Sequence, residues 1–95
     1  MKVRLARRAR ADLAEIWQYS DATWGADRAD DYLDALTDRI LWLAGNRGLW
    51  RARDDIAPGL YSHLQGSHVI VFREDAGELQ IVRILHSRMD IKRHL

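Results

Sequence analysis

Residues 59–86 constrain the fold of this chain most, because they read as three consecutive antiparallel strands joined by two tight turns. The first turn is predicted at Gln65 and Gly66, where glycine supplies the positive φ that a two-residue hairpin of type I′ requires. That register would place His63 opposite His68. The rest of the chain is predicted to cover one face of these strands.

Side-chain alternation along the three strands predicts two different faces. A second turn at residues 75–78 would oppose Phe72 to Ile81 and Val71 to Val82. One face is aliphatic and is expected to form the floor of the core: Leu64, Val69, Val71, Val82 and Ile84. The other face mixes apolar, aromatic and charged groups: Tyr61, His63, His68, Ile70, Phe72, Ile81, Arg83 and Leu85. We expect such a mixed face to be covered by a partner or to form a site.

The N-terminal half predicts one short strand and two helices. Alternation at residues 2–5 indicates the strand, and apolar residues at helical spacing indicate a first helix from residue 9 to about residue 23. A second helix is predicted from Ala26 to about residue 45, with the apolar stripe Ala29, Leu33, Leu36, Ile40 and Leu43. The expected fold is therefore α+β. A short N-terminal strand and an antiparallel helix hairpin pack on a mainly antiparallel sheet with a three-stranded C-terminal meander, in a single domain spanning residues 1–95.

Composition narrows the classes of function. The chain has no cysteine, so disulfides and thiolate chemistry are excluded. No apolar run approaches a membrane span and no secretory signal is recognisable, so we expect a cytoplasmic protein without a membrane partner. The formal net charge is only +1, and we expect direct nucleic-acid binding by the chain alone to be weak or absent.

Two groups of residues could carry chemistry. On the mixed face, His63, His68, Arg83 and His86 could act as acid, base and charge stabiliser in RNA cleavage, or they could be ordinary partly buried residues of a sheet surface. Near the C-terminus His86, Asp90 and His94 have the spacing of helical metal ligands. Because His86 is predicted to end a strand, Asp90 and His94 would remain as a helix-end pair. We therefore expect neither a metal nor a cofactor.

Three stretches of the sequence resemble a known family: ARRARADLAEIWQYSDATWG, RDDIAPGLYSHLQGSHVIVFRED and VRILHSRMDIKRHL. They are similar to the ParE toxins of the RelE/ParE superfamily, which belong to bacterial type II toxin–antitoxin systems. The resemblance implies a toxin that poisons DNA gyrase. It also implies neutralisation by a cognate antitoxin, which begins with a ribbon-helix-helix-like domain and wraps the toxin with its flexible C-terminal portion.

The same superfamily contains ribosome-dependent mRNA endonucleases, which use a tyrosine, or a histidine and a tyrosine, near the C-terminus. No tyrosine follows Tyr61 in this chain. The resemblance therefore favours a gyrase inhibitor without catalytic residues of its own, with an endonuclease as the alternative. An interaction module that binds an antitoxin but has lost its toxicity is a third possibility.

Two surfaces are predicted to bind partners. Cations clustered at the C-terminal end favour binding to an acidic protein surface or to nucleic acid, and an ordinary solvated tail is the alternative. With the resemblance, this end is expected to contact the target through Arg88, Asp90, Lys92, Arg93 and His94. Aromatic residues and arginines are the side chains best able to carry an interface, and the chain has four tryptophans. The antitoxin is accordingly expected to contact Arg7, Arg8, Trp17, Trp24, Tyr32, Trp42, Trp50, Arg53, Tyr61 and Phe72. The alternative is core packing for each tryptophan and an ordinary solvated surface for the arginines at the start of the first helix.

Overall fold

A computed structural model describes all residues of the chain, Met1–Leu95. The order of elements is β1 (Val3–Leu5), α1 (Arg7–Trp24), α2 (Ala26–Gly45), the 3-10 turn η1 (Arg47–Leu49), β2 (Arg51–Ala52), β3 (Tyr61–Gln65), β4 (His68–Asp75), β5 (Glu78–His86) and the 3-10 turn η2 (Ile91–His94). The strands form one sheet in the order β1-β5-β4-β3-β2. Only β1 pairs in parallel, so the predicted α+β fold with its C-terminal meander is confirmed.

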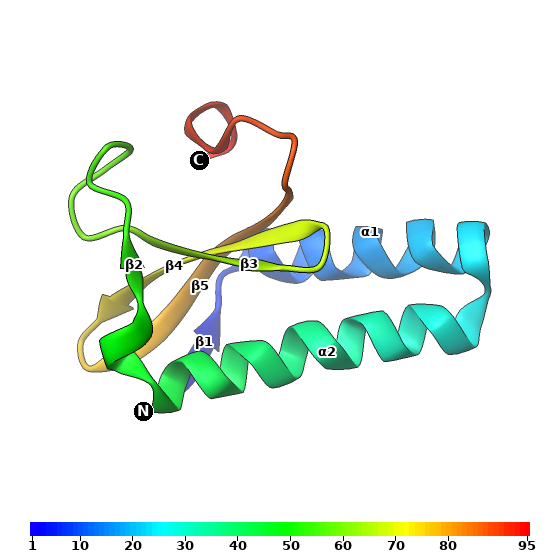
Figure 1. The fold of residues 1–95 in the computed structure, drawn as a ribbon, viewed down its shortest axis with the longest axis horizontal. Coiled ribbons are helices and arrows are strands. Elements are labelled where there is room, and N and C mark those ends of the chain that lie inside the picture. Colours follow the sequence, from blue (N-terminus) through cyan, green and yellow to red (C-terminus); the bar gives the residue numbers. More distant parts are fainter.

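The two helices lie side by side as an antiparallel pair (Figure 1). Gly25 separates them at φ 93, a conformation that glycine adopts without a steric cost. The buried positions of α2 follow the predicted stripe: Ala29, Leu36, Ile40 and Leu43. No helix in the structure has the length and apolarity needed to cross a membrane.

The helices cover the mixed face of the sheet, so the predicted assignment of the two faces was wrong. Ile70, Phe72 and Ile81 are fully buried in the main core, where they pack with Leu36 and Leu43 of α2. The predicted core residue Leu64 is instead exposed. A partner therefore cannot cover most of the mixed face, because α1 and α2 already do.

Two local features also differ from the prediction, and the second of them places Ile84 in the main core and Leu85 in the cluster on the opposite face. The first turn lies one residue later than predicted, so Gln65 rather than His63 opposes His68. The predicted pairing of Phe72 with Ile81 is confirmed, but a β-bulge follows it and Val71 opposes Arg83 instead of Val82. Because a bulge inserts an extra residue into one strand, strict alternation does not continue through it.

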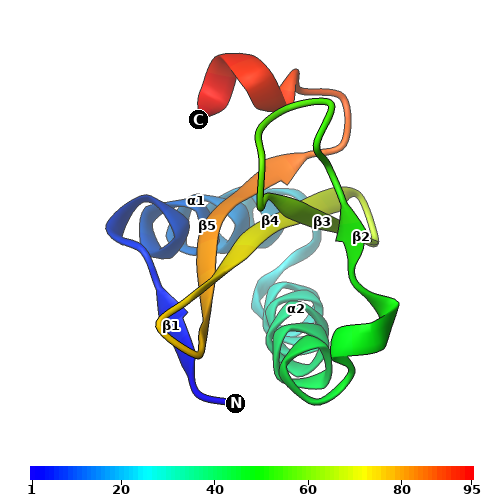
Figure 2. The ribbon, with the colours of Figure 1, turned by 90° about the vertical axis from the view of Figure 1, so that its left-hand side faces the viewer.

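The other face of the sheet carries a second, smaller apolar cluster. Leu60, Val71 and Leu85 are buried there, and Ile91 of η2 packs against them. Figures 1 and 2 show η2, in red, on the side of the sheet away from α2. The C-terminal turn thus covers a patch that the helices leave open.

Candidate functional site

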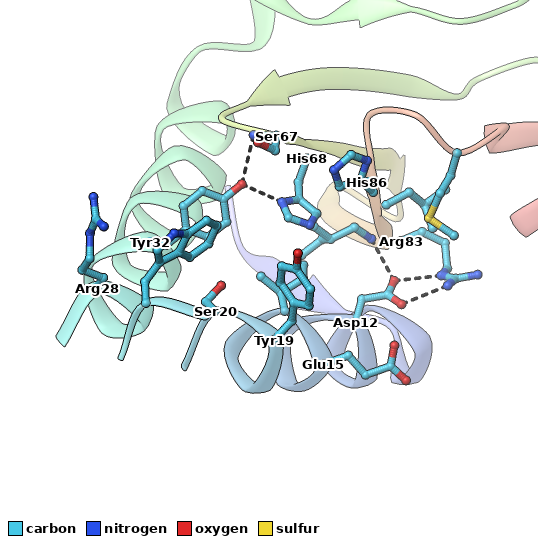
Figure 3. Close-up of a pocket in the computed structure, with 15 residues that line it drawn as sticks. Asp12, Glu15, Tyr19, Ser20, Arg28, Tyr32, Ser67, His68, Arg83 and His86 are labelled. Atoms are coloured by element: carbon cyan, nitrogen blue, oxygen red, sulfur yellow. Dashed lines mark hydrogen bonds and ion pairs between the residues drawn. The ribbon is translucent and has the colours of Figure 1, made fainter. Parts of the chain in front are cut away.

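A pocket of about 550 Å³ lies between the second half of α1, the start of α2 and the adjoining ends of β4 and β5. Its rim includes the exposed side chains of Tyr19, Trp24 and Met89. Tyr19 and Trp24 meet edge to face, with ring centroids 6.3 Å apart. Polar groups from both helices and both strands point into the same space (Figure 3). The pocket therefore combines an apolar rim with a polar wall, as ligand and peptide sites commonly do.

His68 is held in the wall by the hydroxyl of Tyr32. This hydroxyl accepts a hydrogen bond from the backbone N–H of Ser67 at 3.0 Å and lies 2.6 Å from Nδ1 of His68. The one proton of the hydroxyl is then best donated to Nδ1, which leaves the neutral ring of His68 with its proton on Nε2. Burial lowers the pKa of His68, and the nearby His86 lowers it further while Asp12 opposes the shift.

The ring of Tyr32 also explains the glycine of the first turn. Gly66 has φ 59, and a Cβ atom placed on it would lie 2.9 Å from the Tyr32 ring. Glycine is thus required both for the backbone conformation and for the close approach of α2 to the turn. Tyr32 fixes the end of the β3–β4 hairpin against α2.

A second polar cluster joins α1 to β5. The carboxylate of Asp12 accepts hydrogen bonds from Nε and Nη2 of Arg83 at 2.8 and 2.9 Å, and one from the backbone N–H of Ile84 at 2.9 Å. The two side chains are 10% and 11% exposed. The hydrogen bonds to Asp12 raise the pKa of Arg83, although burial opposes this. The remaining nitrogen of the guanidinium, Nη1, donates a hydrogen bond to the carbonyl of His94.

Three of the four residues of the endonuclease alternative meet in the pocket. His68 and His86 have ring centroids 5.5 Å apart, and Arg83 lies in the same wall. His63 is elsewhere, because it opposes Ile70 and its ring packs 5.8 Å from that of Trp42. Burial and the charge of Arg39 lower the pKa of His63. The predicted cross-strand pair of His63 and His68 is therefore wrong.

Sequence reasoning missed Asp12 as a member of this cluster. A signal was present, since Asp12 lies four residues before Ile16 and so falls on the buried stripe of α1. An acidic residue at such a position needs a partner, because an unpaired buried charge is costly. Its partner Arg83 is 71 residues away in the sequence.

The predicted antitoxin contacts divide into surface and core residues. Arg7 and Arg8 are exposed at the start of α1, and Trp24 is 53% exposed at the pocket rim. Trp17 is half-buried and donates from Nε1 to Asp30. Arg53 is half-buried between Asp55 and Ser62.

The remaining predicted contacts belong to the core. Phe72 is fully buried, so its prediction as a surface residue is wrong. Trp50 packs 5.2 Å from both Phe72 and Tyr61 by ring centroids, and its Nε1 donates to the carbonyl of Leu43. Tyr32, Trp42, Trp50 and Tyr61 are all partly buried against the main core.

The predicted target-binding segment follows β5. Arg88, Asp90, Lys92 and Arg93 are exposed, whereas His94 is half-buried. The carboxylate of Asp90 accepts a hydrogen bond from the backbone N–H of Lys92 at 3.1 Å. No group of three histidine, aspartate, glutamate or cysteine side chains in the structure could hold a metal ion.

Comparison with known proteins gives consistent matches. The family model described as ParE toxin of type II toxin-antitoxin system, parDE, matches residues 3–91. Toxin ParE1 of Caulobacter vibrioides is 37% identical over 92 residues, covering 97% of this chain and 95% of that protein. Toxin ParE1 of Mycobacterium tuberculosis is 40% identical over 92 residues, covering 96% and 94%.

A solved structure supports the fold independently. The structure titled chromosomal ParDE TA system from P. aeruginosa has a TM-score of 0.79 and 23% identity, covering 90% of this chain and 95% of that one. At that identity the likeness concerns the fold alone.

Proposed function

The chain belongs to the ParE toxin family of type II toxin–antitoxin systems, and from that premise we propose that it arrests growth by inhibiting DNA gyrase in the cytoplasm. Gyrase is the target that the resemblance to ParE toxins implies. Arg88, Lys92 and Arg93 form an exposed cationic stretch after β5, and this stretch supports the proposal that the C-terminal segment contacts the target. Cations concentrated on one short segment favour contact with an acidic partner surface.

The test is inhibition of gyrase supercoiling by the purified toxin. A triple variant with Arg88, Lys92 and Arg93 changed to Gln should need at least about tenfold more toxin for half-inhibition, because three attractive charges are lost. The matched control changes Arg7, Arg8 and Arg10 to Gln, which removes the same charge from the start of α1. Unimpaired supercoiling at saturating wild-type toxin would reject gyrase as the target. Equal loss in both triples would reject the C-terminal segment as the contact.

A cognate antitoxin, with a ribbon-helix-helix-like first domain, is proposed to neutralise the toxin by placing apolar side chains in the pocket. The exposed aromatic pair Tyr19 and Trp24 supports this, since aromatic groups around a concave site are typical interface anchors. The protein chosen for the test is the product of the reading frame adjacent to this gene. Trp24→Ala with Tyr19→Ala should weaken its binding by at least about 2 kcal/mol. Leu49→Ala is the control, because Leu49 is similarly exposed but lies on η1.

One observation favours the endonuclease alternative. His68 and His86 lie together with Tyr32, so two imidazoles and a phenol share one wall of the pocket. Groups of these kinds can transfer protons in RNA cleavage. Primer extension on messages from toxin-expressing cells would reveal ribosome-phased cuts that disappear with His68→Ala and persist with His63→Ala. If no such cuts are found, this alternative is rejected.

A further inference from the structure

The segment after β5 contains little regular structure of its own. Its η2 turn has four residues, and its backbone hydrogen bonds within residues 87–95 are few and join residues close together in the sequence, such as Arg93 to Asp90. Contacts with the rest of the fold must therefore set its position. One is apolar, where Ile91 packs on the cluster around Leu85. Another joins the backbone N–H of Ser87 to the carbonyl of Ser67 at 2.8 Å.

The remaining tether is the guanidinium of Arg83. Nη1 donates a hydrogen bond to the carbonyl of His94, while Nε and Nη2 both donate to the carboxylate of Asp12. A guanidinium is planar, so two bonds to a carboxylate also fix the direction of its third nitrogen. Helix α1, through Asp12, therefore determines where the end of the chain is held.

This geometry bears directly on the exposed cations. Arg88, Lys92 and Arg93 lie between two fixed points, the end of β5 at His86 and the tethered carbonyl of His94. We propose that Arg83, oriented by Asp12, is a positioning residue that holds this cationic segment in the arrangement its target binds. The part of the proposal that concerns the target rests on the proposed function. The part that concerns the segment's position does not.

The decisive variant is Arg83→Lys, which retains the positive charge. A lysine offers a single nitrogen at the end of a flexible chain, so it can pair with Asp12 but cannot fix a second contact with His94 in the same plane. Arg73→Lys is the matched control, since Arg73 is exposed on β4 and makes no ion pair in the structure. Both variants make the same chemical change in neighbouring strands.

Hydrogen exchange measures the tether without any assumption about the target. The backbone N–H of Met89 donates to His86 and that of Arg93 donates to Asp90. In Arg83→Lys, exchange of the fragment 87–95 should become about tenfold faster, because local opening no longer has to break a charge-assisted hydrogen bond. Exchange in α2 and β4 should stay within about twofold of wild type. Unchanged exchange in 87–95 would overturn the proposal, and so would equal acceleration throughout the molecule.

Gyrase inhibition then tests the functional part. The concentration of Arg83→Lys toxin needed for half-inhibition should be about tenfold higher than for wild type, the same factor as the acceleration of exchange in residues 87–95. Arg73→Lys should match wild type. Faster exchange in 87–95 with unchanged potency would overturn the role in target binding. If wild-type toxin leaves gyrase unaffected, the proposed target fails, and the exchange measurement alone supports or overturns the positioning of the segment.

Discussion

Replacing Asp12 with alanine should be among the most damaging single changes outside the apolar core. The carboxylate is 10% exposed and accepts three hydrogen bonds, two from Arg83 and one from the backbone of Ile84. Asp12→Ala leaves a nearly buried guanidinium with one remaining hydrogen-bond partner, the carbonyl of His94, and with only the unpaired charge of Glu15 nearby to balance it. The N–H of Ile84 is left without an acceptor. Breaking a buried ion pair from one side costs about 3 to 5 kcal/mol. Because Arg83 lines a pocket that water can enter, we expect the lower value, about 3 kcal/mol.

Urea unfolding followed by tryptophan fluorescence measures this cost. With a slope of about 1.5 kcal/mol per molar urea, the midpoint should fall by about 2 M. Asp34→Ala is the control, because Asp34 is exposed on α2 and makes no ion pair in the structure, so its loss should change stability by less than about 0.5 kcal/mol.

A double variant separates the stranded charge from the lost contacts. Asp12→Ala with Arg83→Met removes the unpaired guanidinium and should be more stable than Asp12→Ala alone, since an apolar side chain is tolerated where a lone charge is not. An effect of Asp12→Ala below about 1 kcal/mol would refute the reasoning. So would a double variant less stable than the single one.

Three further predictions concern the core and the first turn. Gly66→Ala should lower the free energy of unfolding by about 2 kcal/mol, since alanine is strained at φ 59 and its Cβ would press on Tyr32, while Gly48→Ala, with open space around it, should be nearly neutral in the same urea titration. Burial lowers the pKa of His68 and of His63 below the usual 6.5, so just below pH 6.5 the unfolded chain binds more protons than the native state does. Stability should therefore be fully present above pH 6.5 and fall as the pH drops from there toward the lowered pKa values, and His68→Gln should flatten a plot of urea midpoint against pH. Trp50→Phe removes the hydrogen bond to the Leu43 carbonyl and should cost about 1 to 2 kcal/mol by thermal unfolding; an effect no larger than that of Trp24→Phe at the exposed rim would contradict the assignment of Trp50 to the core.

The two helices and the three-stranded meander could be predicted because they depend on local patterns, whereas the parallel pairing of β1 with β5 and the short strand β2 could not. Leu36, Ile40 and Leu43 repeat at helical spacing, and Gly25 interrupts the pattern between the helices. The covered face could not be predicted in the same way, since Ile70 and Val71 are both apolar and either could point to the core. The bulge beside Val71 then reversed the predicted faces of Ile84 and Leu85.

The candidate site depended on long-range geometry to a greater extent. His68 meets His86 only in the observed register, and Asp12 meets Arg83 across 71 positions of sequence. Each residue alone is compatible with an ordinary surface. The basic C-terminal segment could be identified from composition, whereas the contact of Arg83 with the His94 carbonyl, which holds its far end, could not.

The guanidinium of Arg83 lines the pocket and also binds the carbonyl of His94. If a ligand in the pocket drew the guanidinium toward itself, the hydrogen bond from Arg83 to the carbonyl of His94 would break. The binding free energy of that ligand would then include the cost of releasing residues 87–95. Thermodynamic linkage makes such an effect reciprocal, so a target that clamps those residues would weaken the ligand's binding by the same factor. A protein bound only at the pocket could in this way silence a surface that it never touches.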